Sequence, residues 1–274
     1  MSLDYLRPID HRSDAVADLF DELPLWSAPF GMLLLDRVPL TPGTCVLDLG
    51  AGTGFLTVEL AQRLGPGARV IAVDPWEGAM KRLRRKVEAL ALSNVELLQM
   101  DAADLDLPPE SVDLIVSNLG VNNFERAAAV LAACRRAARP GARLLISTNL
   151  QGHMAEFYAV FREVLLELGQ AHRLPMLEAH VAHRGTVASV SALVEGAGFT
   201  VDPARLVEGS FRLRYAGGQA LLRHYFVRLG FLPAWTAIPD PDRLHATFLL
   251  LERRLDELAA REGGLSLTVP MVLV

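Results

Sequence analysis

The segment VLDLGAGTG at residues 46–54 decides the fold class. It places a short apolar run directly before Gly50, Gly52 and Gly54, a pattern typical of a buried strand that turns tightly into a helix. Glycines at such a turn allow backbone conformations that other residues avoid, and they let a ligand approach bare main chain. The segment therefore predicts a nucleotide-like ligand at the carboxyl end of a parallel strand.

The sequence around this segment, over residues 44–149, alternates apolar runs with amphipathic stretches, as βαβ units on a parallel sheet do. The expected strands are 44–49, 69–74, 95–100, 112–118 and 142–149, and the expected helices between them are 54–64, 77–91 and 126–138, the last closed by Pro140-Gly141. The predicted fold class is thus α/β, a doubly wound and mostly parallel sheet. Ligands of such sheets bind outside the carboxyl ends of the strands.

The rest of the chain predicts helical additions to this core. The expected organisation is an N-terminal helical cap at 1–42, a Rossmann-like core at 43–150, a helical insert at 151–186, a continuation of the core at 187–216, a second helical insert at 217–263 and a closing strand at 264–274. Pro24 and Pro29 are expected to break the cap helix, and a strand is expected at 199–206. We expect the cap and the inserts to cover a small-molecule pocket.

Composition narrows the class of partner. The 274 residues carry a net charge of −5 and are 51% hydrophobic, the balance of a globular chain rather than a nucleic-acid binder. Apolar runs are too short for a signal peptide or a membrane span, so a cytoplasmic protein is expected. Cys45 and Cys134 have no partners at metal spacing and are interpreted as buried apolar residues.

The glycine spacing discriminates among nucleotide ligands. A dinucleotide fingerprint needs its third glycine at position 55, which is Phe55 here, so an NAD-linked oxidoreductase is only a third interpretation. No Gly-Lys-Ser/Thr sequence follows, which excludes a P-loop. Two further strands end in acids, Asp74 and Asp101. Asp74 is placed to accept the two hydroxyls of a ribose, and Asp101 the exocyclic amine of an adenine.

With these features, residues 40–150 resemble the class I S-adenosylmethionine-dependent methyltransferases, whose first motif is an acid followed by Gly-x-Gly-x-Gly. The resemblance implies S-adenosyl-L-methionine as cofactor, with the glycine loop against its methionine and ribose parts, Asp74 on the ribose and Asp101 with Ala102 at the adenine. The cofactor-binding residues expected on this basis are Asp48, Gly50, Ala51, Gly52, Gly54, Asp74, Pro75, Trp76, Asp101, Ala102 and Asn118.

The segment after the fourth strand separates methyltransferase families by acceptor. Residues 120–123, GVNN, resemble the Gly-Leu-Arg-Asn element of the ubiquinone and menaquinone C-methyltransferases, although Asn122 stands where those enzymes have arginine. The motifs of the DNA amino- and cytosine C5-methyltransferases are missing. Asn118 and Asn149 stand where metal-dependent O-methyltransferases need carboxylates, so no metal is expected.

Methyl transfer from a sulfonium is an in-line displacement, for which the protein holds acceptor and methyl group together in a dry site. His153, which follows the fifth strand, and Asn118 are the candidate catalytic residues, with Tyr158 and His224 as further candidates for a base. The expected substrate pocket contains Trp26, Phe30, Asn122 and Tyr158.

The predicted function is methyl transfer from S-adenosylmethionine to a small apolar or aromatic molecule. The main alternative is a cofactor-binding domain without transferase activity, acting as a sensor or partner-binding protein. The expected partner is the small-molecule acceptor, with no nucleic acid and no membrane span. The sequence leaves open the acceptor, the atom methylated and the oligomeric state, a homodimer included.

Overall fold

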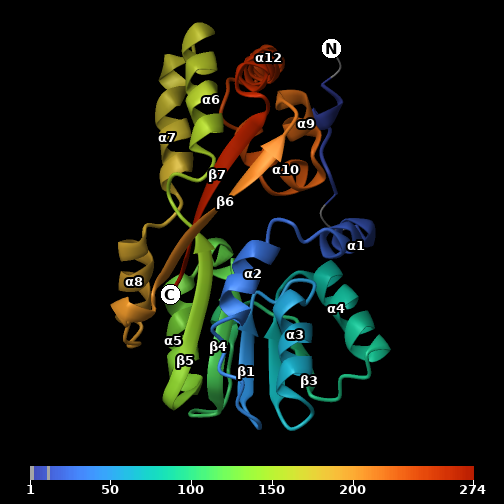
Figure 1. Cartoon of the computed structure of the whole chain (residues 1–274), viewed down its shortest axis with the longest axis vertical. Coiled ribbons are helices and arrows are strands. Elements are labelled where there is room, and N and C mark those ends of the chain that lie inside the picture. The colour runs from blue at the N-terminus through green and yellow to red at the C-terminus, as the bar shows by residue number, and fades with distance from the viewer. Residues whose placement is uncertain (1–2, 11–12) are drawn as a thin grey trace. The chain divides into compact units, whose positions relative to one another are not determined.

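The computed structural model describes residues 3–10 and 13–274 (Figure 1). The chain forms two compact units. The core unit comprises Arg12–Thr148, Thr186–Glu208 and Met271–Val274, and the helical unit comprises Met1–His11, Asn149–Gly185 and Gly209–Pro270. Their boundaries divide the expected N-terminal cap, because residues 3–10 belong to the helical unit and residues 13–42 to the core unit.

Within residues 3–10 and 13–274 the sheet has seven strands, in the order β3-β2-β1-β4-β5-β7-β6. The strands are β1 (Cys45–Leu49), β2 (Arg69–Val73), β3 (Val95–Leu98), β4 (Val112–Asn118), β5 (Ala138–Asn149), β6 (Val207–Tyr215) and β7 (Leu265–Leu273). The pairs among β1 to β5 are parallel, and the strand order reverses between β1 and β4. The predicted doubly wound, mostly parallel sheet is confirmed, and the reversal is where such sheets bind ligands.

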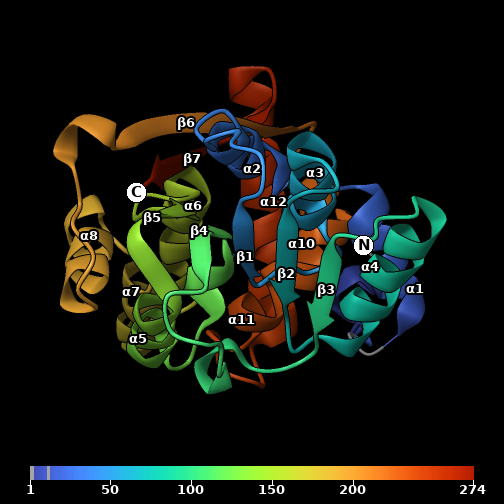
Figure 2. The ribbon, with the colours of Figure 1, turned by 90° about the horizontal axis from the view of Figure 1, so that it is seen from below.

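Helices cover both faces of the sheet in the core unit (Figure 2). They are α1 (Asp14–Glu22), α2 (Ala28–Leu35), α3 (Phe55–Leu64), α4 (Glu77–Ala89), α5 (Ala127–Ala137) and α8 (Val187–Gly196), with short 3-10 turns η2 (Ala102–Asp104), η3 (Gly120–Asn123) and η5 (Pro203–Arg205). Helices α2 and α3 pack on Val46 and Val70, and α5 packs on Leu47 and Ile71. Successive strand residues therefore face opposite layers, which explains why these strands are apolar throughout.

Three expectations about proline-containing stretches are wrong. Pro140-Gly141 lies inside β5 rather than closing α5, because a residue before proline favours the extended conformation and the chain is already extended at Ala138. Pro29 does not break a helix, since it lies in the first turn of α2, where its missing N–H is harmless.

The third wrong expectation is the strand at 199–206. There Asp202 accepts a hydrogen bond from Ala204 N (3.0 Å) and Pro203 begins the turn η5, so the strand starts only at Val207.

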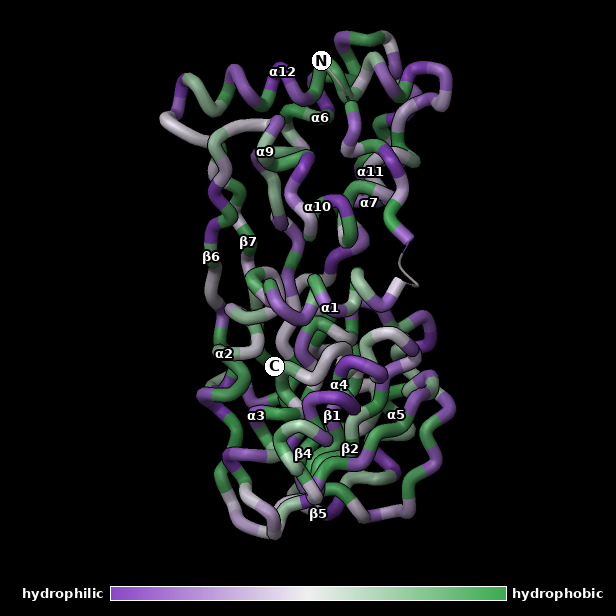
Figure 3. The backbone as a smooth tube through the Cα atoms, turned by 90° about the vertical axis from the view of Figure 1, so that its right-hand side faces the viewer, coloured by the Kyte–Doolittle hydropathy of each residue, from purple (hydrophilic) through white to green (hydrophobic). Residues whose placement is uncertain are grey.

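The helical unit is built on aromatic packing. Its elements are η1 (Asp4–Leu6), α6 (Ala155–Glu167), η4 (Ala171–Arg173), α7 (Leu174–Ala182), α9 (Gly218–Arg223), α10 (Tyr225–Gly230), α11 (Leu232–Thr236) and α12 (Leu244–Glu262). The fully buried Trp235 stacks on Phe157 and Phe231, with ring centroids 4.0 and 5.6 Å apart. Hydrophobic and hydrophilic residues alternate along α12, as an amphipathic helix requires (Figure 3). None of the helices in the described residues combines the length and the apolar character that crossing a membrane requires.

Candidate functional site

The glycine loop after β1 has the conformation that its sequence predicts. Gly50, Gly52 and Gly54 have φ values of 70°, 54° and 92°, in the left-handed region that disfavours side chains. A Cβ at Gly54 would lie 2.2 Å from Leu83 of α4, and one at Gly50 would lie 3.1 Å from the Cα atom of Gly120. A Cβ at Gly52 would meet no atom within 4 Å. Two of the glycines thus permit close packing, and Gly52 borders open space that a ligand can fill.

Asp74, one residue past β2, holds this loop. Its Oδ2 accepts a hydrogen bond from Gly52 N (2.8 Å), and its Oδ1 accepts one from Trp76 N (2.8 Å). The side chain is 9% exposed, and burial raises its pKa although both hydrogen bonds oppose that shift. Each carboxylate oxygen has a second lone pair. The geometry therefore lets Asp74 order the loop and accept ligand hydroxyls at the same time.

Asp48 supports the loop from inside the protein. It is buried and accepts a hydrogen bond from the Thr57 hydroxyl on α3 (2.6 Å). Burial raises the pKa of Asp48 to about 7, and the nearby charge of Asp74 acts in the same direction. Its observed contacts tie β1 to α3, which gives the acid of the motif a structural role. Ala51, beside it in the loop, is also buried.

The acid after β3 already has partners in this structure. Asp101 Oδ1 accepts a hydrogen bond from Ala103 N (2.8 Å), and Oδ2 lies 3.0 Å from the Arg126 guanidinium, which also contacts Asp104 (2.9 Å). These contacts lower the pKa of Asp101. Ala102 is buried beside it. A ligand amine at Asp101 would share this carboxylate with Arg126, a residue that the sequence analysis missed.

Pro75 and Trp76 follow Asp74 at the start of α4. Pro75 is exposed, and Trp76 is half-buried with its ring edge against Phe20 of α1, the ring centroids being 5.6 Å apart. Helix α1 is further fixed by Asp21, which lies 2.7 Å from Arg82 and 2.5 Å from Lys86 on α4. The N-terminal helix is thereby attached beside the second strand end.

Side chains at the end of β4 hold α2 in place. Asn118 Nδ2 donates to the carbonyl oxygen of Ser27 (3.2 Å), and its Oδ1 accepts from the Ser147 hydroxyl (2.8 Å). A Cβ on Gly31 of α2 would lie 2.2 Å from the Phe55 ring, so this glycine allows the close approach. A Cβ on Gly120 would lie 2.8 Å from the carbonyl oxygen of Leu49. The sequence analysis predicted neither of these two close approaches. Their only sequence signal is a glycine within an apolar stretch.

The remaining core-unit candidates lie near the same strand end. Asn122 Oδ1 accepts a hydrogen bond from the Thr148 hydroxyl (2.6 Å). Trp26 is half-buried and packs against Phe30, with ring centroids 5.5 Å apart, whereas Phe30 is fully buried. The structure thus brings Trp26, Phe30 and Asn118 together with the loop before α2.

The candidates His153 and Tyr158 belong to the helical unit. His153 is buried with its ring centroid 5.2 Å from that of Phe231, and burial lowers its pKa to about 3. A histidine with that pKa is a weak base at neutral pH. Tyr158 is buried on α6, and its hydroxyl accepts a hydrogen bond from Trp235 Nε1 (3.1 Å). Burial also lowers the pKa of His224.

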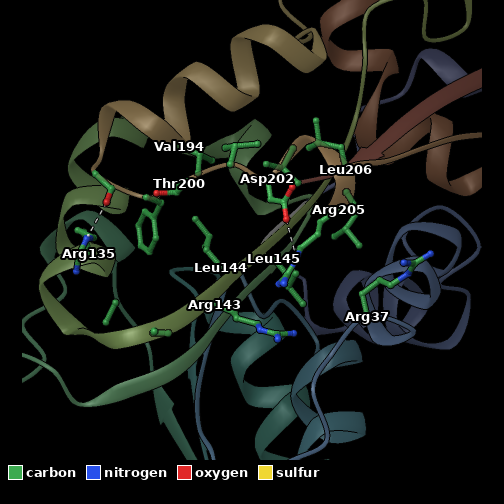
Figure 4. Close-up of a pocket in the computed structure, with 18 of the residues that line it drawn as sticks. Arg37, Arg135, Arg143, Leu144, Leu145, Val194, Thr200, Asp202, Arg205 and Leu206 are labelled. Atoms are coloured by element: carbon green, nitrogen blue, oxygen red, sulfur yellow. Dashed lines mark hydrogen bonds and ion pairs between the residues drawn. The ribbon is translucent and has the colours of Figure 1, made fainter.

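A pocket of about 790 Å³ lies elsewhere in the core unit (Figure 4). Leu144 and Leu145 of β5, Phe199 and Val201 form its apolar part, and several arginines surround it. None of the candidate cofactor-binding, catalytic or substrate-pocket residues named in the sequence analysis lines this pocket. It is therefore separate from the strand ends that carry the cofactor motif.

Comparison with known proteins identifies the segment around the glycine loop. Residues 46–141 match the family described as "Methyltransferase domain". The segment from β1 to the start of β5 is thus similar to methyltransferase domains. The fold is that of class I S-adenosylmethionine-dependent methyltransferases: a SAM-dependent methyltransferase from Aquifex aeolicus superimposes with a TM-score of 0.54 and 24% identity, covering 73% of this chain and 92% of that one.

Two curated relatives show how far the similarity extends along the chain. A demethylmenaquinone methyltransferase of Listeria welshimeri is 34% identical over 132 residues, which are 47% of this chain and 56% of that protein. An uncharacterized 37.1 kDa protein in transposon TN4556 of Streptomyces fradiae is 28% identical over 245 residues, or 88% of this chain and 65% of that protein. The chain thus spans little more than half the length of its Listeria relative.

The residues of the methyltransferase domain fit S-adenosylmethionine. Gly52 leaves open space beside a loop of bare main chain, and the buried Asp74 offers acceptors for two hydroxyls. Asp101 and Ala102 follow the neighbouring strand, where the adenine of such a cofactor would lie. The sequence expectation of this cofactor is supported by the family and by the donor and acceptor groups present.

Proposed function

We propose that this protein is an S-adenosylmethionine-dependent methyltransferase that acts on a small apolar or aromatic molecule. The observation that carries the proposal is the Gly52–Asp74 hydrogen bond, which joins the glycine loop to the acid of the next strand and leaves Gly52 open to a ligand. A loop fixed in this way is pre-organised for a nucleoside, so little ordering accompanies binding.

In this mechanism the core unit holds the cofactor. Gly50, Gly52 and Gly54 give its methionine and ribose parts access to the main chain, and Asp74 accepts hydrogen bonds from the ribose. Asp101 and Ala102, with Pro75 and Trp76 flanking, receive the adenine. When bound, S-adenosylmethionine would supply a methyl group on a sulfonium, and transfer to the acceptor atom would break the carbon–sulfur bond and release S-adenosylhomocysteine.

Positioning of the acceptor is assigned to side chains with rigid surroundings. Asn118 is held by Ser27 and Ser147, so it presents a fixed polar group at the end of β4. Trp26, Phe30 and Asn122 supply the rest of the acceptor side in the core unit. His153 and Tyr158, in the helical unit, stay predictions from the sequence. The low pKa of His153 favours a positioning role over that of a general base.

The apolar or aromatic character of the acceptor rests on two lines of support. One is the similarity to a protein named demethylmenaquinone methyltransferase. The other is the aromatic content of the candidate side chains, which bury a flat ligand well. A cytoplasmic location and a partner set without nucleic acid stay predictions from composition.

Calorimetry followed by a transfer assay tests the function. The purified chain is titrated with S-adenosylhomocysteine, NAD and ATP, and then incubated with methyl-labelled S-adenosylmethionine and a set of phenols, naphthols and quinols. We expect heat with S-adenosylhomocysteine alone and label in at least one aromatic product. Equal or tighter binding of NAD would favour an oxidoreductase. Tight S-adenosylhomocysteine binding with no labelled product in the whole set would favour a cofactor sensor.

A further inference from the structure

The pocket beside β5 lies at the edge of that strand rather than over one face of the sheet. Leu144 belongs to the apolar cluster that contains Leu131 of α5, whereas Leu145 belongs to the cluster that contains Leu34 of α2, in the opposite layer. Both leucines line the pocket, and all of its lining residues belong to the core unit. Because successive side chains of a strand point to opposite faces, a cavity that both leucines reach lies at the strand edge.

The backbone of β5 is open on this side. Strand β7 ends at Leu273, and the next residue, Val274, exchanges two hydrogen bonds with Ile146 of β5 (2.9 Å each). Backbone groups of alternate residues point to the same side of a strand, so Leu144 and Ala142 present their N–H and C=O groups on the side where β7 pairs with Ile146. Among the residues that the structure describes, no strand continues β7 alongside Leu144 and Ala142.

The far wall of the pocket is segment 198–206, which the sequence predicted in part as a strand. It contributes the side chains of Phe199 and Val201 and includes the turn η5, but it is not a strand of the described sheet. Figure 4 shows this segment and β5 on two sides of the pocket. The pocket is therefore a slot between a strand edge and an irregular segment, where one further extended strand would fit.

Arginine side chains from several elements border the slot. They are Arg37 after α2, Arg135 of α5, Arg139 and Arg143 of β5, and Arg205 of η5. Asp202 is the one acidic side chain among the lining residues, and it lies 3.1 Å from Arg205. The side chains around the slot thus carry an excess of positive charge.

The arginines differ in how far the protein itself pairs them. Arg139 lies 2.6 Å from Asp113, and Arg135 donates to the carbonyl oxygen of Gly198 (3.1 Å). Within residues 3–10 and 13–274, Arg143 has neither a hydrogen bond nor an ion pair. Its guanidinium is exposed at the slot and is available to a bound carboxylate.

We propose that this slot binds an extended acidic segment of a partner protein, which adds as a strand to the β5 edge. Its backbone would pair with the N–H and C=O groups of Ala142 and Leu144. Its side chains would alternate between the two faces of the sheet. Acidic side chains on one face would meet Arg143 and Arg37, and apolar side chains on the other face would meet Leu144 and Phe199.

Charge favours this occupant over two others. A second copy of the same edge would bring like charges together at Arg143, the usual way in which edge strands avoid pairing with themselves. A nucleic acid would contact the arginines but leave the backbone edge and the apolar wall unused, and the net charge of −5 on the whole chain opposes a long polyanion. An acidic strand uses the cations, the backbone and the apolar wall.

Peptide binding by the full chain tests the charge requirement. The probe is a fluorescein-labelled, amidated Glu-Val-Glu-Val-Glu-Val peptide, and its binding is followed by fluorescence anisotropy. We expect binding that weakens as salt is added, and weaker or no binding of the peptide in which Gln replaces each Glu. Combining Arg37→Gln with Arg143→Gln should weaken the acidic peptide by roughly 3- to 30-fold, because two exposed ion pairs are lost.

Two controls separate the slot from general effects. Arg84→Gln changes an exposed arginine of α4 that does not line the pocket, so this variant should bind the peptide as the wild type does. The double variant at Arg37 and Arg143 should bind S-adenosylhomocysteine with unchanged affinity, because neither arginine belongs to the proposed cofactor site. The inference thus goes beyond methyl transfer and is tested separately from it.

Methylation of the peptide backbone tests strand addition itself. One probe is N-methylated at its three glutamates and the other at its three valines. A strand that joins one edge uses the N–H groups of alternate residues only. One probe should therefore lose roughly 10-fold or more in affinity, and the other should bind as the unmodified peptide does.

Several outcomes would overturn the inference. They are no binding of the acidic peptide at millimolar concentrations, equal affinity for the Glu and Gln peptides, and equal affinity of the two N-methylated probes. Unchanged binding in the folded double variant would also overturn it. Tighter binding of a single-stranded oligonucleotide with the same number of charges would assign the arginines to a nucleic acid instead.

Discussion

The core unit and the helical unit differ in the surroundings of their ionisable side chains. In the core unit the acids at the strand ends are engaged by backbone N–H groups or cations, as Asp74 is by Gly52 and Trp76. In the helical unit burial lowers the pKa of His153 to about 3, and burial also lowers the pKa of the partly buried Arg184. At the strand ends of the core unit charged side chains have partners, whereas in the helical unit desolvation disfavours the charged forms.

The largest effect is expected at Gly54 of the core unit. Gly54→Leu forces a side chain into a left-handed position and against Leu83, which should lower the free energy of unfolding by about 3 kcal/mol. Gly52→Ala is the matched control, with open space at its Cβ, and should cost about 1 kcal/mol while weakening S-adenosylhomocysteine binding. Urea unfolding and calorimetry measure both. Equal stability of the two variants would contradict the packing role of Gly54.

Asp74 should give the largest loss of cofactor affinity. Asp74→Ala removes a charged acceptor and should weaken S-adenosylhomocysteine by roughly 10- to 100-fold, equivalent to about 1.5–3 kcal/mol. Because the same carboxylate holds Gly52, Asp74→Asn should recover part of the affinity by keeping one acceptor oxygen. A folded Asp74→Ala variant that binds with unchanged affinity would show that Asp74 orders the turn only.

His153 should make the helical unit sensitive to acid. Its pKa of about 3 in the folded state is below the 6.5 of an exposed histidine, so the unfolded chain binds the proton more tightly. Stability from this group is complete above pH 6.5 and is lost as the pH falls, by about 2 kcal/mol between pH 6.5 and pH 5. In His153→Phe, the free energy of unfolding measured across that pH range should no longer show this dependence. An unchanged pH profile in that variant would contradict the buried neutral state.

Asp48 should give the opposite slope in the core unit. Its pKa is raised to about 7 by burial, so the folded state holds the proton more tightly than the unfolded state does. Stability is complete below the ordinary pKa of 3.8 and is lost as the pH rises towards 7, by about 2 kcal/mol between pH 5 and pH 6.5. Asp48→Asn, which keeps an acceptor for Thr57, should remove this slope and leave that of His153. A wild-type slope retained in the variant would contradict a protonated Asp48.

The smallest effect is expected at Arg126. Its contacts with Asp101 and Asp104 are exposed, so solvent screens them and Arg126→Ala should change stability little. Because the variant frees Asp101 Oδ2, S-adenosylhomocysteine affinity should stay the same or rise, as calorimetry can show. A clear loss of affinity would instead make Arg126 part of the cofactor site.

The amino-acid sequence by itself determined strands β1 to β5 and the cofactor motif, but it misplaced β6. Apolar runs of five to seven residues and glycines at fixed spacing are local signals, and they located β1, β2, β4 and the loop at Gly50 to within about a residue. The acids Asp74 and Asp101 were found because parallel strands end at one edge of the sheet, a rule that needs only strand boundaries.

Only the tertiary structure decided which side chains meet. Gly31 closely approaches Phe55 and Asn118, and Gly120 closely approaches Leu49. Tyr158 contacts His180 and Trp235. These pairs are 22 to 87 positions apart in the sequence. Burial, together with the charges of Arg184 and His180, lowers the pKa of His153 to about 3. Periodicity reports which face of a helix is apolar, but it carries no information about which distant residue covers that face. The spacing of neighbouring residues is enough to locate the cofactor motif. The contacts of the helical unit instead depend on packing between segments that lie far apart in the sequence.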